Sequence, residues 1–197
     1  MIIQQAYRYE LDPNNVQRTL LAKHAGTARY AWNWALARRK EALERGGPVP
    51  DAIAQHREWN RWKKANAPWA CEVSKCAPQE SLRDLDRAFK NFRRGRQAGR
   101  AIGFPRFKKK GEHDGFRLTG SVHIEPVSVQ LPRLGKLRTK ERTALKGRIL
   151  SASVSREADR WFVSLTVERA RPDPAPVAGE AVGVDLGLDS FADFSDG

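Results

Sequence analysis

Apolar residues in the first half of the chain recur at helical spacing. Over residues 16–43 they return every three or four positions, which predicts one long helix, or two helices broken at Gly26. Residues 2–11 alternate loosely before an Asp-Pro pair at 12–13, which indicates a short strand that leads into a helix cap with proline at the first helical position. The chain is therefore expected to open with a strand and continue as helix.

Two further helices are predicted before the pattern changes. Asp51 is placed to cap a helical stretch whose two tryptophans share one face, and Pro68 ends that stretch. A third helix is expected to begin near Pro78, to carry apolar residues at three-four spacing, and to stop at Gly95. The region up to residue 95 should thus be helical.

Beyond Gly95 the pattern changes to short alternating runs punctuated by glycine and proline. The clearest pair of strands covers residues 148–155 and 160–168, joined by the tight connection 156–159. Four apolar residues of the second strand share one face: Trp161, Val163, Leu165 and Val167. The second half is expected to be an antiparallel, barrel-like sheet, so the fold class is α+β.

The last part of the chain differs from both halves. Residues 171–180 (RPDPAPVAGE) hold three prolines and no periodicity, which is typical of a linker. Residues 181–197 (AVGVDLGLDSFADFSDG) then predict the first strand of another domain. Because an independent α/β domain typically needs about 50 residues, we expect the sequence to stop inside that domain.

A carboxylate stands between two glycines in this closing strand. Gly183, Asp185 and Gly187 share one face, so a metal ion or a phosphate could approach the carboxylate closely. Taken alone, the pattern is a weak signal, because many ordinary buried strands contain one acidic residue.

The charge of the protein points to a polyanionic partner. Its formal net charge is +13 and its pI is about 10.3, which favours nucleic acid first and an anionic membrane surface second. The positive charge is confined to the first part, since residues 170–197 contain one arginine against six acidic residues.

The densest basic segment covers residues 83–110, with eleven basic residues and two acidic ones. Its arginines and lysines are suited to phosphate contacts, and two of its phenylalanines could stack on bases. The candidate nucleic-acid-binding residues are Arg83, Arg87, Lys90, Arg93, Arg94, Arg96, Arg100, Phe104, Arg106, Phe107, Lys108, Lys109 and Lys110. The alternative is a solvated charged face. Phe89 and Phe92 lie on the apolar stripe and are expected in the core.

Several classes of protein and site are disfavoured. No stretch approaches the roughly 18 to 20 apolar residues of a membrane span, and the N-terminus is too polar for a signal peptide. A cytoplasmic protein without a membrane partner is therefore expected. Cys71 and Cys76 have no second cysteine pair or histidine pair near them, so no zinc site is predicted.

Five segments, taken in order, resemble the N-terminal half of the OrfB/TnpB proteins of insertion sequences. They are YRYELDPNNVQRTLLAKHAGTARYAWNWALARRKE, SLRDLDRAFKNFRRG, GFPRFKKK, ILSASVSREADRWFVSLTVE and VGVDLGLDSFADFSDG. That family was long described as transposases and is now understood as RNA-guided DNA endonucleases related to type V CRISPR effectors. The resemblance covers nearly the whole chain.

The resemblance implies a division of the chain into domains. Residues 14–95 would form a helical, helix-turn-helix-like recognition lobe, inserted in an OB-like wedge domain made of residues 1–13 and 96–170. After the linker at 171–180, residues 181–197 would begin an RNase H-like (RuvC) nuclease domain. The implied partners are a structured guide RNA and double-stranded DNA.

The resemblance also gives Asp185 a role. It matches the first carboxylate of the RuvC-like nuclease, which would make it both a catalytic residue and a ligand of Mg²⁺ in two-metal hydrolysis. The other ligands and a four-cysteine zinc ribbon would lie beyond residue 197, so this chain alone is expected to bind nucleic acid without cleaving it. Three further acids are interpreted as hairpin and turn residues: Asp189, Asp193 and Asp196.

Two alternatives remain open. A naturally shortened member of the family could act as a repressor-like, catalytically inactive nucleic-acid-binding protein. The VGVDLG segment also resembles the phosphate-binding strand of actin-like ATPases and sugar kinases, but there the second glycine is usually followed by threonine or serine. Here Leu188 and Asp189 follow it.

Overall fold

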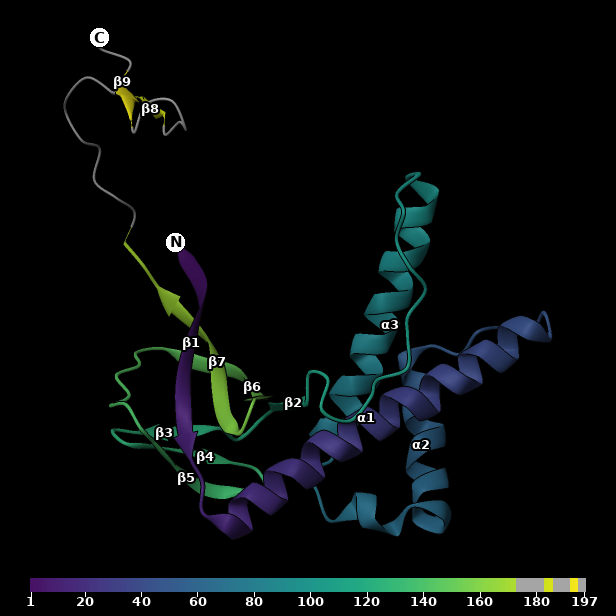
Figure 1. Cartoon of the computed structure of the whole chain (residues 1–197), viewed down its shortest axis with the longest axis horizontal. Helices are drawn as coiled ribbons and strands as arrows, with labels where there is room; N and C mark the ends of the chain where they lie inside the picture. The colour runs from purple at the N-terminus through teal and green to yellow at the C-terminus, as the bar shows by residue number, and fades with distance from the viewer. Residues whose placement is uncertain (173–182, 186–191, 195–197) are drawn as a thin grey trace.

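A computed structural model of the chain describes residues 1–172, 183–185 and 192–194 (Figure 1). Its helices are α1 (Asn15–Glu44), α2 (Ala52–Asn66), the short 3₁₀ helix η1 (Pro68–Cys71) and α3 (Cys76–Gln97). Its longer strands are β1 (Ile2–Asp12), β6 (Arg148–Glu157) and β7 (Arg160–Ala170). The shorter strands are β2 (Gly115–Thr119), β3 (His123–Glu125), β4 (Ser128–Leu131), β5 (Gly135–Thr139), β8 (Val184–Asp185) and β9 (Asp193–Phe194).

Seven strands form one antiparallel sheet in the order β2-β6-β7-β1-β5-β4-β3. The first strand of the chain lies near the middle, where β1 pairs with β7 along its whole length, from Ile2 opposite Ala170 to Leu11 opposite Trp161. In the order of the chain, the three α-helices lie between β1 and β2. The predicted α+β class and antiparallel sheet are confirmed. The sheet is open, with β2 and β3 at its edges, where the sequence had favoured a barrel-like closure.

The hairpin of β6 and β7 follows its predicted pattern closely. Its turn is tighter than the four residues expected, because the strands continue to Glu157 and Arg160 and leave two residues, one of which is Ala158 at φ 53°. The apolar residues predicted to share a face are all buried: Trp161, Val163, Leu165 and Val167. Alternation with period two therefore fixed the register of this hairpin against the core.

Helix α1 is a single helix of 30 residues, so of the two alternatives that the sequence left open, the unbroken helix is confirmed. Its cap lies two residues later than the sequence suggested. Asn14 is the N-cap: its side chain accepts from the Gln17 backbone N–H, and the Gln17 side chain accepts from the Asn14 N–H. This reciprocal pair satisfies two free amides at once, which explains why Pro13 precedes the cap instead of opening the helix.

The bounds of α3 correct two expectations. The helix begins at Cys76, so Pro78 lies in the first turn, where its missing N–H is not needed. It also continues past Gly95 to Gln97. Gly95 is buried because Ile102 packs against it, and a Cβ built at Gly95 would lie 2.1 Å from the Ile102 Cδ1. The glycine thus permits a close contact and does not end the helix. At Asp51 the expected cap of α2 is confirmed, since its Oδ1 accepts from Ala54 N at 2.7 Å.

The buried apolar side chains of the described residues form two cores, and α1 takes part in both. In Figure 1 this helix extends from the sheet to the other helices. One core lies under the sheet and includes Leu21, Ala25 and Ala28 from the N-terminal half of the helix. The other lies among the three helices and includes the apolar residues from Ala31 to Leu36 of α1 together with Trp59 and the apolar stripe of α3. Phe89 is buried there as expected, and Phe92 is half-buried.

A buried arginine joins the three helices. Arg39 of α1 is 2% exposed, and it donates to the Gln55 side chain of α2 at 2.8 Å and to Asp86 of α3 at 3.0 Å. Gln55 in turn donates to the Ala35 carbonyl at 2.8 Å. Burial lowers the pKa of Arg39, an effect that its hydrogen bond to the Asp86 carboxylate opposes. Removing a single partner would leave a buried polar group unsatisfied, so the three side chains depend on one another.

A buried histidine fastens the segment between η1 and α3 to α1. His24 Nδ1 lies 2.7 Å from the Leu20 carbonyl oxygen, and its Nε2 lies 3.0 Å from the Ser74 backbone nitrogen. Because a carbonyl can only accept and an amide can only donate, Nδ1 carries the proton and Nε2 is the acceptor. Burial lowers the pKa of His24, so the ring is neutral in the folded protein.

We predict that His24 makes stability fall in mild acid. The unfolded chain takes up a proton on this ring as the pH drops through about 6.5, whereas the folded ring resists it, so stability is kept above that pH and lost below it. The loss should reach at most about 1.4 kcal/mol per pH unit for this one proton. Urea unfolding of the wild type and of His24→Gln between pH 8 and pH 5 measures it.

The variant should be less stable at pH 8 but should show a flatter dependence on pH. His56, whose pKa burial also lowers, titrates in both proteins and cancels in the difference. His123→Gln is the control, since His123 is exposed. Parallel pH curves for the wild type and His24→Gln would contradict the assignment.

Gly147 is predicted to tolerate no side chain. Its φ is +128°, and a Cβ there would lie 2.4 Å from the Glu168 carbonyl oxygen of β7. Gly147→Ala should lower the free energy of unfolding by about 2 kcal/mol or more. Gly120→Ala is the matched control, because Gly120 has a φ of +100° with no atom within 4 Å. Gly120→Ala should lower the free energy of unfolding by only about 1 kcal/mol. Equal losses of stability in the two variants would refute the steric argument.

Candidate nucleic-acid interface

The basic segment 83–110 lies on the outer part of α3 and on the chain that returns from it. In Figure 1 the connection after Gln97 runs back along α3 toward β2. Ile102 on this return packs against Gly95 of the helix. The helix end and the return segment therefore form one projecting unit that carries most of the predicted nucleic-acid-binding residues.

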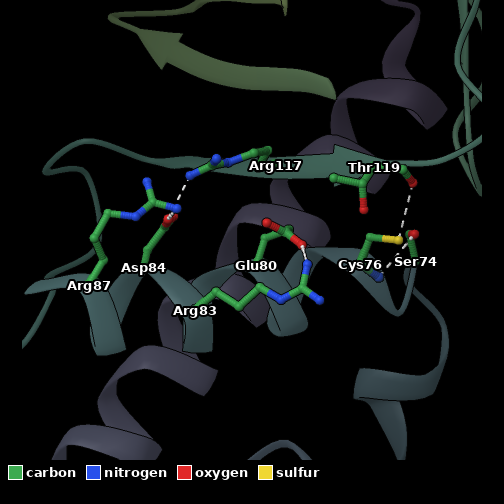
Figure 2. Close-up of polar contacts among 8 residues, drawn as sticks. All are labelled: Ser74, Cys76, Glu80, Arg83, Asp84, Arg87, Arg117 and Thr119. Carbon is green, nitrogen blue, oxygen red and sulfur yellow. Dashed lines mark hydrogen bonds and ion pairs between the residues drawn. The ribbon is translucent and has the colours of Figure 1, made fainter. Parts of the chain in front are cut away.

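The basic residues nearest the sheet are engaged within the protein. Figure 2 shows Asp84 between two guanidinium groups, with Arg117 of β2 at 2.6 Å and Arg87 at 3.6 Å. Arg83 pairs with the buried Glu80 at 2.7 Å. The Arg117 contact connects α3 to the sheet, as does the Cys76 thiol, which donates to the Thr119 carbonyl at 3.4 Å. The contacts of Arg117 and Cys76 contribute to holding α3 on the sheet, whereas the Arg83 and Arg87 pairs lie within the helix.

Lys90 is also paired, with its Nζ 3.0 Å from the Asp86 carboxylate that binds Arg39. The other eight basic residues of the segment are exposed and form no ion pair within the described residues. They are Arg93, Arg94, Arg96, Arg100, Arg106, Lys108, Lys109 and Lys110. Arg94 donates only to a neutral acceptor, the Asn91 side chain, at 3.2 Å. The predicted segment thus divides into three paired cations and eight that have no ion-pair partner among the described residues.

The return segment is fixed to α1 through its backbone. Asn33 donates from its amide to the Lys108 carbonyl at 2.9 Å and accepts from the Lys108 N–H at 2.8 Å. Trp32 donates from its indole to the Arg106 carbonyl at 2.9 Å. These bonds leave the side chains of the segment outside, so its charges are presented from a defined backbone.

Lys108 differs from its neighbours. Its Nζ lies 4.2 Å from the centre of the Trp32 ring, a favourable cation–π distance. Desolvation lowers the pKa of Lys108 although much of the side chain is exposed. Its charge is therefore partly directed toward the protein, and Lys109 and Lys110 are the more accessible cations.

The two phenylalanines proposed for stacking have different surroundings. Phe104 is half-buried and meets Phe89 and Phe92 edge to face, with ring centres 5.2 and 5.4 Å apart. Phe107 is 47% exposed, with the Lys40 ammonium 5.4 Å from its ring centre. Phe104 thus has a packing role, whereas Phe107 offers a ring at the surface.

Asp185 lies in the short strand β8 and is exposed. It stands opposite Asp193 in the antiparallel pairing with β9, which places Asp193 on the second strand of a hairpin as expected. Asp189, Asp196 and most of the predicted linker lie outside the described residues. Among the residues that are described, no group of three or more His, Cys, Asp and Glu side chains is arranged to hold a metal ion. Cys71 and Cys76 are both free thiols.

Comparison with known proteins connects this chain to a family. A family model named HTH_OrfB_IS605 and described as a helix-turn-helix domain matches residues 1–48. A protein of Escherichia coli (strain K12) named "Putative RNA-guided DNA endonuclease InsQ" is 34% identical over 98% of this chain. The chain belongs to the OrfB/TnpB family. A relative of like description from Mycobacterium tuberculosis (strain CDC 1551 / Oshkosh) is 31% identical over 98% of the chain, and one from Streptomyces pristinaespiralis is 28% identical over 99%.

The chain spans about half the length of these curated relatives, 48% of the first two and 49% of the third. Within the range matched by the OrfB model, residues 1–48, the fold is one strand followed by one uninterrupted helix. None of the described helices is both long enough and apolar enough to cross a membrane.

Asn33 was not singled out by the sequence, because a single polar residue in a helical stretch gives no signal of a long-range backbone contact. We predict that Asn33→Ala releases the return segment. Loss of its two bonds should increase trypsin cleavage after residues 106–110 about tenfold, since local opening becomes easier. Mass spectrometry of the first fragments measures the rate.

Asn66→Ala is the matched control, because within the described residues the Asn66 amide bonds only to the Trp62 carbonyl of its own helix. Its digestion pattern should equal that of the wild type. An unchanged cleavage rate in Asn33→Ala would show that packing alone holds the segment.

Proposed function

We propose that this chain is the N-terminal half of an RNA-guided DNA endonuclease and that it holds a structured guide RNA and duplex DNA. The observation that supports the proposal is the set of eight exposed cations, unpaired among the described residues, on the projecting unit of α3 and its return segment. The relatives from Escherichia coli and Mycobacterium tuberculosis are named as putative RNA-guided DNA endonucleases, and their names suggest which nucleic acids these cations would contact.

The physical basis is the exchange of counterions. Arginine and lysine side chains that contact phosphates release the cations condensed on the nucleic acid, so binding is favoured and falls steeply with salt. A carboxylate within the protein competes with the phosphate for the same guanidinium. Arg93, Arg96 and Arg100 have no such competitor among the described residues, so they should contribute more than Arg83 and Arg87.

The finer domain assignment is part of the same proposal. The open sheet of β1–β7 would be the OB-like wedge domain, and α1–α3 would be the recognition lobe inserted after β1. In support, β1 pairs with the last strand of the sheet although about 150 residues separate them in the chain. The region from β8 onward would begin the RuvC-like nuclease domain.

In this proposal Asp185 supplies one carboxylate to a Mg²⁺ site. An exposed aspartate suits a hard cation that prefers oxygen ligands. Two-metal hydrolysis needs several carboxylates, so the remaining ligands would come from other residues. The metal would supply the activated water and stabilise the leaving oxygen. The role of Asp185 would be to hold the metal in position.

We predict that the unpaired cations set affinity and its dependence on salt. The triple variant Arg93→Gln, Arg96→Gln, Arg100→Gln should bind a fluorescent RNA hairpin and a DNA duplex at least about tenfold more weakly near 0.1 M salt. The slope of log K against log salt should decrease in magnitude by about 2 to 3 for three lost phosphate contacts. Fluorescence anisotropy over a salt series measures both quantities.

The control removes the same charge elsewhere. Arg57, Arg61 and Lys64 of α2 are exposed and unpaired within the described part of the chain, so the triple glutamine variant at these positions has the same net charge. It should retain nearly the full slope. Equal losses in the two triple variants would leave only a non-specific charge effect and refute the proposed surface. Mg²⁺-dependent cleavage by this chain, abolished by Asp185→Ala, would refute the need for further ligands.

A further inference from the structure

A groove of about 450 Å³ lies along α1, outside the basic segment. One wall is the face of α1 that carries Gly26, Tyr30 and Asn33, and the other is η1, which carries Trp69. The volume is within the range of about 300 to 1,000 Å³ that is usual for small-molecule sites. None of these residues belongs to the predicted nucleic-acid-binding set.

Two partly exposed aromatic rings form a corner in this groove. Tyr30 is 41% exposed and Trp69 is 42% exposed, and their rings are perpendicular, with centres 5.2 Å apart. Tyr30 is supported from behind by Trp62, whose ring is nearly parallel to it at 5.9 Å. A planar group placed in the corner could stack on one ring while its edge meets the other, an arrangement that aromatic pairs favour.

The floor of the groove is open because residue 26 is a glycine. A Cβ there would have a single neighbouring atom, the Arg29 Nη2 at 3.9 Å, so packing within the described chain does not require glycine. A glycine inside a helix costs about 1 kcal/mol relative to alanine. The position therefore sacrifices helix stability and keeps the groove free of a side chain.

Charge beside the groove, rather than at its rim, favours a nucleotide over a purely apolar ligand. The nearest cations of the groove are neutralised, since Lys23 pairs with Glu72 at 2.7 Å and Arg29 pairs with Asp114. At the far end, Asn33 holds the backbone of Lys108, which places the groove next to the unpaired cations of the return segment. An aromatic corner beside a phosphate-binding segment matches a base attached to its phosphate.

We propose that this groove receives one unpaired base of an RNA, stacked in the corner of Tyr30 and Trp69, while the adjacent phosphates lie along residues 106–110. The inference rests on the proposed function. RNA is favoured over duplex DNA because bases in RNA bulges and loops are already unstacked, whereas a DNA base must first be flipped out of its helix.

The experiment uses the whole chain and two RNA hairpins that differ by a single bulged 2-aminopurine. The wild type should bind the bulged hairpin more tightly and quench its fluorescence by stacking. Trp69→Ala should weaken binding of the bulged hairpin by about fivefold to a hundredfold and abolish the quenching. Binding of the hairpin without the bulge, and the salt slope of both, should not change. Trp69→Phe should recover most of the affinity.

A second variant tests the groove without removing any contact. Gly26→Leu fills the floor and should raise helix stability, so a loss of bulge preference cannot be ascribed to unfolding. Ala65→Leu adds the same side chain to an exposed position of α2 and should behave as the wild type. Thermal unfolding of each variant accompanies the binding series.

The outcomes separate this inference from the proposed function. Salt-dependent binding of both hairpins with no effect of Gly26→Leu or Trp69→Ala would refute the groove and leave the basic surface intact. No binding of either hairpin would refute the proposed function itself. Tighter binding of a bulged DNA hairpin than of the bulged RNA would overturn the assignment to RNA.

Discussion

The continuity of α1 is the constraint on which the rest of the structure depends. Thirty residues in one helix extend about 45 Å, far enough to bury Leu21 and Ala25 under the sheet and Leu36 among the helices. Because both cores are built on one rigid element, the sheet cannot turn relative to the helices without breaking that helix. Gly26 leaves the helix unbroken because Ala25 and Ala28, on either side of it, are both buried in the core under the sheet.

The arginines and lysines of α3 serve two physical purposes that their sequence alone does not distinguish. Near the sheet, each cation of α3 has an acidic residue three or four positions away along the helix and forms an ion pair with it. Asp84 also pairs with Arg117 of the sheet. Beyond Phe92 the helix has no acidic residue, and the cations there form no ion pair within the described structure. The placement of Asp84 and Asp86 therefore separates the part of the helix that stabilises the fold from the part available to phosphate.

Periodicity predicted the elements well because it reports what a residue does locally. The β6–β7 hairpin and the stripe of α3 followed from spacing, and errors of one or two residues arose at caps, where a single bond such as that of Asn14 decides the register. Contacts between distant residues left no such trace. Arg39, His24 and Asn33 each bind a group at least 16 positions away, so their roles become visible only in the fold. The ordered motifs identified the family, but the open edges of the sheet did not follow from them.

Residues 24–33 of α1 connect the features that bear on function. His24 holds the Ser74 amide, and Ser74 follows shortly after η1, which carries Trp69. On the neighbouring face, Tyr30 and Gly26 form the other wall of the groove, and Asn33 fixes the basic return segment. The position of Trp69 relative to Tyr30 thus depends on a bond that requires a neutral histidine. Protonation of His24 would place two N–H groups against each other and weaken the attachment of η1, so the aromatic corner and the fold should loosen over the same range of pH.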